Sequence, residues 1–178
     1  MKKLCLILAL ILILFTLCCC GQTQQTNSNF LRIHIRADSN TQNDQSIKYA
    51  VKDAIMCYLT PYICNITTKQ QAISVVKQHL NNIKNVCDTV LKNNNFDYVS
   101  TVKLCQENFP DRAYNNLVLP SGVYDALIVE LGSGSGNNWW CVVYPPLCFV
   151  GDYNGTNSIV YKSKLQEVIS DWMQKCGK

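Results

Sequence analysis

Histidine is scarce in this chain of 178 residues, which contains only His34 and His79, in distant segments. Neither histidine belongs to a recognisable catalytic motif, so the usual base that activates a nucleophilic side chain is missing. After residue 20 there is also no Cys-x-x-Cys pair, the commonest element of a structural zinc site. The sequence therefore predicts no metal site, no cofactor and no catalytic residue.

The chain also lacks a strong charge of one sign. It has 16 lysines and arginines against 12 aspartates and glutamates, for a formal net charge of +4. Lys2 and Lys3 belong to an N-terminal leader, and without them 14 basic residues face the same 12 acidic ones. This near-neutral balance gives no sign of a nucleic-acid-binding surface. No internal repeat is visible, and the length suits one domain with its own core.

The N-terminus has the pattern of an export signal. Lys2 and Lys3 precede an apolar run over residues 4–17, which is short for a stable membrane span. Residues 1–20 are therefore predicted to be a signal peptide, with an uncleaved membrane anchor as an alternative. Residues 17–21 also loosely resemble a bacterial lipoprotein processing site with Cys20 as the lipid carrier, although Cys19 stands where a small residue is usual. All three interpretations place the body of the protein outside the membrane.

Cysteines are frequent, and most of them lie outside the leader. Four of the 11 cysteines precede Gly21, and the body carries the other seven: Cys57, Cys64, Cys87, Cys105, Cys141, Cys148 and Cys176. An exported chain can form disulfides. Because seven is odd, at least one thiol stays free or pairs with another chain.

The densest signal in the sequence lies in residues 132–149. Three glycines at alternate positions lead into Trp139 and Trp140, after which Cys141 and Cys148 bracket a Pro-Pro pair. Adjacent residues of a strand point to opposite faces, so one tryptophan can be core while the other needs a second layer, a partner or water. The two prolines remove backbone donors and exclude a central sheet position. A short strand that leads into a rigid loop is therefore predicted.

Two catalytic interpretations of this stretch can be weighed against a structural one. A phosphate-binding loop would need Lys-Ser or Lys-Thr after the glycines, and this chain has Asn-Asn instead. A nucleophilic Cys141 would need a nearby base, so an exported cysteine hydrolase is kept only as an alternative. The preferred interpretation is a loop stiffened by a disulfide between Cys141 and Cys148, which carries an exposed aromatic side chain.

Residues 30–37 alternate between apolar and polar side chains, the pattern of a half-buried strand. The two faces would carry Leu31, Ile33 and Ile35 on one side and Arg32, His34 and Arg36 on the other. His34 is interpreted as a solvated strand residue rather than a ligand.

Helical spacing of apolar residues predicts three helices. The first covers residues 41–59, with Thr41 as its N-cap and Pro61 ending it. The second covers residues 68–92, and the third covers residues 162–175 near the C-terminus.

Alternation predicts strands over residues 96–108 and 123–131, and a further strand that contains the two tryptophans. Residues 117–119 are expected to form a hairpin with residues 123–131 around a turn at residues 120–122.

These elements predict an α+β fold, in which an antiparallel or mixed sheet of about four strands has helices packed mainly on one face. Residues 21–29 are polar and are expected to be a flexible linker. Residues 30–178 are then a single domain.

Three segments also carry a family pattern: residues 31–39, residues 109–127 and residues 138–149. In motif order and residue type they resemble the stage II sporulation protein R family of endospore-forming bacteria, the last segment nearly residue for residue. Two departures are Asp38, where the family pattern has Asn, and Asn137, where a His is common. The second departure argues against a histidine-dependent activity at this site.

The resemblance implies a signalling protein that is not an enzyme. Such a protein would be made in the forespore and exported across its membrane into the space between forespore and mother cell. There it would activate, by protein–protein binding, a membrane-embedded aspartyl protease of the mother cell that processes the sigma-E precursor. A cell-envelope lipoprotein with a structural role is the other alternative, and membrane contact is expected only through the N-terminal segment. The residues predicted to contact the partner or shape its loop are Asn138, Trp139, Trp140, Tyr144, Pro145, Pro146 and Phe149.

Overall fold

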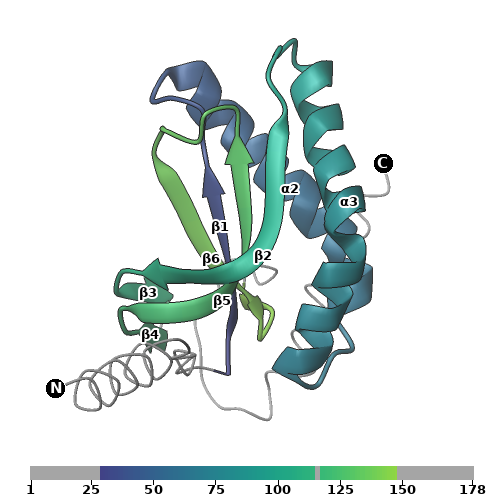
Figure 1. Cartoon of the computed structure of the whole chain (residues 1–178), viewed down its shortest axis with the longest axis vertical. Helices are drawn as coiled ribbons and strands as arrows, with labels where there is room; N and C mark the ends of the chain where they lie inside the picture. Colours follow the sequence, from purple (N-terminus) through teal and green to yellow (C-terminus); the bar gives the residue numbers. More distant parts are fainter. Residues whose placement is uncertain (1–28, 115–116, 148–178) are drawn as a thin grey trace, which may run out of the picture.

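The computed structural model describes residues 29–114 and 117–147 of the chain (Figure 1). In chain order the elements are β1 (Leu31–Arg36), α2 (Gln42–Ile63), α3 (Lys69–Asn93), β2 (Ser100–Phe109), β3 (Arg112–Tyr114), β4 (Leu117–Leu119), β5 (Gly122–Leu131) and β6 (Asn138–Tyr144). The predicted leader, nearly all of the linker and the predicted helix over residues 162–175 lie outside the described residues.

The strands form a mixed sheet in the order β2-β5-β1-β6, with β1 parallel to β5 and the other neighbours antiparallel. Helices α2 and α3 lie side by side on one face of this sheet (Figure 1). The predicted α+β class, with a mixed four-stranded sheet and helices packed against it, is confirmed.

Both described helices begin with a side-chain cap. Thr41 Oγ1 accepts a hydrogen bond from the backbone N–H of Asp44 at 3.2 Å, as predicted, and Thr68 forms a capping box with Gln71. The prediction that Pro61 ends the first helix is wrong, because α2 continues through it to Ile63. Pro61 lies in the last turn, where it forfeits a single donor, and the helix still closes over it through the N–H of Cys64.

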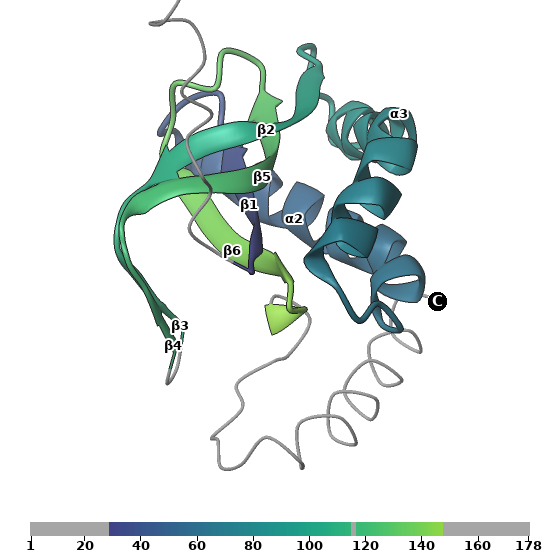
Figure 2. The same ribbon diagram turned by 60° about the horizontal axis from the view of Figure 1, so that its bottom comes forward.

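Strands β2 and β5 form a long antiparallel hairpin, with a register that runs from Ser100 opposite Leu131 to Phe109 opposite Gly122. The pair β3–β4, called the arm from here on, extends this hairpin as a separate two-stranded sheet. Pro110 and Pro120 interrupt the ladder on both strands where the arm begins, since neither can donate a backbone hydrogen bond. Figure 2 shows β2 and β5 curving so that the arm lies away from the helices.

The predicted hairpin between residues 117–119 and 123–131 is therefore wrong. β4 pairs with β3, and β5 pairs with β2. Residues 120–122 form a kink along one side of the hairpin rather than its turn, and sequence alternation cannot distinguish these two arrangements.

The sheet buries side chains on both faces. The main core lies between the sheet and the helices, and it includes Leu31, Ile33 and Ile35 from β1 together with Leu127, Val129 and Leu131 from β5. A second cluster lies on the opposite face and is built on Phe109, Tyr124, Ala126 and Ile128, with Phe30, Cys105 and Trp140 against it. The predicted alternation along β1 is confirmed, but its polar face is not solvated.

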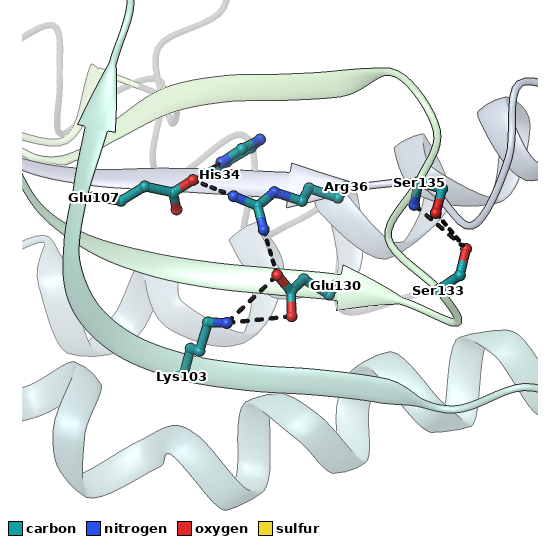
Figure 3. A network of polar contacts seen from close by, with 7 residues as sticks. All are labelled: His34, Arg36, Lys103, Glu107, Glu130, Ser133 and Ser135. Carbon is teal, nitrogen blue, oxygen red and sulfur yellow. Dashed lines mark hydrogen bonds and ion pairs between the residues drawn. The ribbon is translucent and has the colours of Figure 1, made fainter.

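The glycine-rich loop between β5 and β6 packs against the loop that follows β1. The backbone N–H of Gly136 donates to the carbonyl of Ala37 at 2.8 Å, and the N–H of Ser133 donates to Asp38 Oδ1 at 2.6 Å. Ser133 also bonds Ser135 within its own loop (Figure 3). A Cβ at Gly136 would overlap the backbone carbonyl of Ser39, so the glycine permits this close approach.

Candidate functional site

The two adjacent tryptophans of β6 point to opposite faces of the sheet, as predicted. Trp139 packs against the main core, and Lys52 Nζ lies 5.8 Å from its ring centroid. Trp140 packs against the second cluster instead. Both side chains are half-buried, so each is partly core and partly surface.

The other predicted contact residues are divided between environments. Asn138 is exposed at the start of β6. Tyr144 faces the main core, and its hydroxyl donates to the carbonyl of Thr67 at 2.6 Å. Pro145 is exposed and Pro146 half-buried, whereas Phe149 lies outside the described residues. The predicted set therefore does not lie on one face of the sheet, because Trp139 and Tyr144 point toward the helices.

The described cysteines are in two states. Cys57 and Cys141 are disulfide-bonded, whereas Cys64, Cys87 and Cys105 are free thiols. Cys148 and Cys20 lie outside the described residues, so the Cys141–Cys148 bridge and the lipidation of Cys20 stay predictions. A disulfide-bonded Cys141 has no thiolate to act as a nucleophile, so the structure gives no support to a cysteine hydrolase.

All three arginines of the chain lie toward the face opposite the helices. Arg32 and Arg36 project from β1, and Arg112 projects from the arm. This side of the sheet, called the second face, also carries polar and aromatic residues of the neighbouring strands: Lys103, Glu107 and Phe109 of β2, Tyr124 and Glu130 of β5, and Trp140 of β6.

One part of the second face is a row of alternating charges (Figure 3). Arg36 donates to both Glu107 and Glu130. Lys103 Nζ lies 3.3 Å from Glu130, and His34 Nδ1 lies 3.2 Å from Glu107. Arg36 thus has two carboxylate partners, and the row is close to electrically neutral.

His34 is 4% exposed and lies between this row and the aromatic cluster. Its ring stacks on Trp140 with centroids 5.2 Å apart and meets the edge of Phe109 at 5.9 Å. Burial lowers the pKa of His34, and the neighbouring Asn138 and Glu107 offset part of this effect. In the part of the chain that the structure describes, no atom meets His34 Nε2 in hydrogen-bonding geometry, although Asn138 lies near the ring. The prediction of a solvated His34 is wrong, because the curved hairpin brings β2 over β1.

Arg32 has no exposed surface, yet most of its described neighbours are aromatic rings rather than hydrogen-bond partners. Its guanidinium carbon lies 4.1 Å from the ring centroid of Phe109 and 4.7 Å from that of Tyr124. Nη2 donates to the hydroxyl of Tyr114 at 2.9 Å, but Nε and Nη1 have no hydrogen-bond partner among the described residues. A buried donor without a partner costs about 1–3 kcal/mol, and more on a charged group. A desolvated cation–π contact contributes about 2 kcal/mol, so the two rings offset part of this cost.

Arg112 lies above the other side of the same aromatic cluster. Its guanidinium carbon is 4.1 Å from the ring centroid of Trp140, and its hydrogen bond to the backbone carbonyl of Asp111 is long, at 3.5 Å. Among residues 29–114 and 117–147, neither Arg32 nor Arg112 forms an ion pair with a carboxylate. Sequence reasoning missed this pair, since only the strand order places the arm beside β1 and β6.

Two other kinds of site are not found in the part of the chain that the structure describes. It contains no group of three or more His, Cys, Asp or Glu side chains arranged to hold a metal ion. None of the helices described is both long and apolar enough to cross a membrane.

Comparison with known proteins gives a consistent result. The family model described as stage II sporulation protein R matches residues 27–154. The stage II sporulation protein R of Bacillus subtilis (strain 168) is 31% identical over 154 residues, which cover 83% of this chain and 69% of that relative. No solved structure matches the chain. The residues of the second face all lie within the matched range.

Proposed function

Because the chain belongs to the stage II sporulation protein R family, we propose that it is an exported sporulation signal that acts by binding another protein. Its partner is a membrane-embedded aspartyl protease of the mother cell, which processes the sigma-E precursor once activated. The observation that carries this proposal is the family match, which spans both the second face and the strand with the two tryptophans.

The structure supports a binding role through the composition of the second face. Trp140 and Arg112 are half-buried side chains in contact with each other, at 4.1 Å from guanidinium carbon to ring centroid. Tryptophan and arginine are the residues that most often dominate the binding energy of protein interfaces. Val118 is 68% exposed but is paired with Ala113, so it points to the side of the arm opposite Arg112. We therefore place the partner contact at Trp140 and at the side of the arm that carries Arg112.

The proposal also assigns a place of action. Residues 1–20 direct export across the forespore membrane, so that the domain acts in the space between the two cells. The leader has three alternative fates. It is cleaved, it is retained as a membrane anchor, or it is processed so that Cys20 carries a lipid. Metabolic labelling with a radioactive fatty acid distinguishes the lipid from the other two, because only a lipidated chain retains label after denaturing electrophoresis.

Co-expression in a non-sporulating bacterium tests the signalling function. The host would produce this chain, the protease and the sigma-E precursor, and processing would be followed by immunoblot. We expect processing that depends on this chain, and its absence would overturn the proposal. Trp140→Ala should reduce the rate of processing roughly tenfold or more, as for a typical interface hot spot. Tyr49→Ala is the matched control, since Tyr49 is 48% exposed on α2, on the helix side of the sheet.

The same assay separates binding from a cysteine hydrolase. A hydrolase predicts that Cys141→Ser abolishes activity while Cys148→Ser does not, because only the nucleophile is essential. A bridge between the two residues predicts equal effects of both substitutions. Equal loss in both variants would therefore favour the bridge over the enzyme.

A further inference from the structure

We propose that Arg32 and Arg112 together receive the carboxylate of an acidic side chain on the protein partner. This inference rests on the proposed binding function and adds the chemistry of the contact. It assigns the carboxylate-binding role to the second face, where these two guanidiniums border the same aromatic cluster.

Arg36 provides the internal comparison for Arg32, since both project from β1 on the same face. Arg36 is half-buried and binds two glutamates. Within residues 29–114 and 117–147 the fully buried Arg32 binds one phenol hydroxyl, and its other two nitrogens have no hydrogen-bond partner. Arg36 therefore has two carboxylate partners, whereas no described carboxylate binds Arg32. Buried donors normally have acceptors, so the nitrogens of Arg32 lack an anionic one.

The position of Tyr114 indicates how an acceptor would bind. The guanidinium presents two edges to a carboxylate, and both edges include Nη2. In this structure Nη2 donates to the hydroxyl of Tyr114. Each edge uses a different hydrogen of Nη2, so the hydroxyl can occupy only one edge. A bidentate carboxylate on the other edge would pair the second Nη2 hydrogen with Nε or Nη1, which have no hydrogen-bond partner among the described residues. Arg112 and Tyr114 are two residues apart on β3 and therefore face the same side of the arm, which places the second guanidinium beside the same cluster.

The surroundings favour a carboxylate over a phosphate group. Phosphates in proteins are commonly held by free backbone N–H groups at helix N-termini or in loops. Here β1 lies between β5 and β6, so the ladders on both of its sides use its backbone groups. The walls of the cluster are the rings of Phe109, Tyr124 and Trp140. A flat anion with one charge matches a flat guanidinium that lies between rings.

Side-chain NMR of the arginines tests this proposal directly. The chain has only three arginines, so full-length protein labelled with ¹⁵N-arginine in a mild detergent gives three Nε signals. The probe is sodium acetate, with sodium chloride at equal ionic strength as the reference. We expect a saturable shift of the Arg32 signal in acetate and none in chloride, while the Arg36 signal stays in place. An Arg32 signal that does not respond to acetate overturns the proposal.

Tyr114→Phe provides a second variant that keeps the ring and the fold. It removes the hydroxyl that occupies one Nη2 hydrogen, so both edges of the guanidinium become available and acetate should reach half-saturation at a several-fold lower concentration. Unchanged or weaker acetate binding in this variant contradicts the proposed geometry. Inorganic phosphate forms the other arm of the titration, and saturation at a lower concentration than acetate would overturn the assignment to a carboxylate.

The titration contains no protease, so its result is independent of the signalling assay. Intact sigma-E processing together with an unresponsive Arg32 overturns the carboxylate site alone. A saturable Arg32 response together with no processing supports the site as a carboxylate receptor and overturns the proposed partner.

Discussion

His34 and Trp140 are paired across β1 and β6, and their rings stack with an interplanar angle of 26°. The stack connects the tryptophan that we propose as a partner contact to the row of alternating charges on the second face. Arg112 contacts the same tryptophan from the arm. A partner that binds Trp140 would therefore contact a side chain that touches both β1, which carries Arg32, and the arm, which carries the Tyr114 hydroxyl that Arg32 binds.

The stability of the protein should fall at mildly acidic pH because of His34. Its pKa in the folded state lies below the ordinary value of 6.5, chiefly because of burial. As the pH falls below that value, the unfolded chain binds the proton first, so the free energy of unfolding decreases. Urea denaturation at about pH 7.5 and about pH 5.5 should show this loss, and His34→Gln should reduce it.

His79→Gln is the matched control, because it removes the chain's other histidine from α3. Each substitution replaces one histidine with glutamine, but the two histidines lie in different surroundings, on β1 and on α3. If both variants reduced the pH dependence to the same extent, the assignment of the effect to His34 would be wrong.

The contact between Arg112 and Trp140 should be measurable as a coupling energy. A guanidinium at this distance from an indole at a partly exposed site contributes about 0.5–1 kcal/mol. In a double-mutant cycle, Arg112→Gln and Trp140→Leu should each destabilise the domain, and together by less than the sum. Urea denaturation of the four proteins gives the coupling. Strict additivity would show that the arm does not rest on Trp140 in solution.

Gly136→Ala should destabilise the fold by about 1–3 kcal/mol, the usual range for an overpacked site. The new methyl group would overlap the backbone carbonyl of Ser39 and approach Ala37 Cβ to 3.0 Å, so one of the two loops must shift. Ser135→Ala is the control in the same loop, where an exposed side chain is shortened and a change within about 0.5 kcal/mol is expected. Equal midpoints for the two variants in urea would contradict the close packing of the loops.

Much of the fold could be predicted from the sequence because its signals are local. The cap at Thr41, the helical spacing of α3 and the alternation along β5 are each determined by residues a few positions apart. The opposite faces of Trp139 and Trp140 follow from the geometry of any strand.

The second face could not be predicted, since it depends on strand order. β5 lies between β1 and β2, and the curved hairpin then brings Glu107 to His34 and Arg36. Alternation correctly placed His34 on one face of its strand, but it cannot say whether that face meets water or another layer. The error at Pro61 came from a local rule, which says that proline ends a helix but does not account for a proline within the last turn.

Cysteine alkylation will test both the free thiols and the predicted bridge. In the folded chain without reductant, N-ethylmaleimide should label half-buried Cys64 first and Cys105 more slowly, because burial raises the pKa of Cys105. Cys87 is fully buried, and burial raises its pKa to about 12. Since the thiolate is the reactive form, Cys87 should react far more slowly than Cys64 and Cys105, and full labelling should require unfolding.

The disulfide-bonded cysteines should resist labelling until a reductant is added. Mass spectrometry of the unreduced digest should show Cys141 joined to Cys148, as the sequence predicts for the loop after β6. The fully reduced and denatured chain is the control, in which every cysteine present must carry label. Two labelled thiols at Cys141 and Cys148 before reduction would rule out the bridge, and Trp140 would then depend on the sheet and the arm alone for its position. A link from Cys141 to a different cysteine would keep the strand anchored but leave the Pro-Pro loop unclosed.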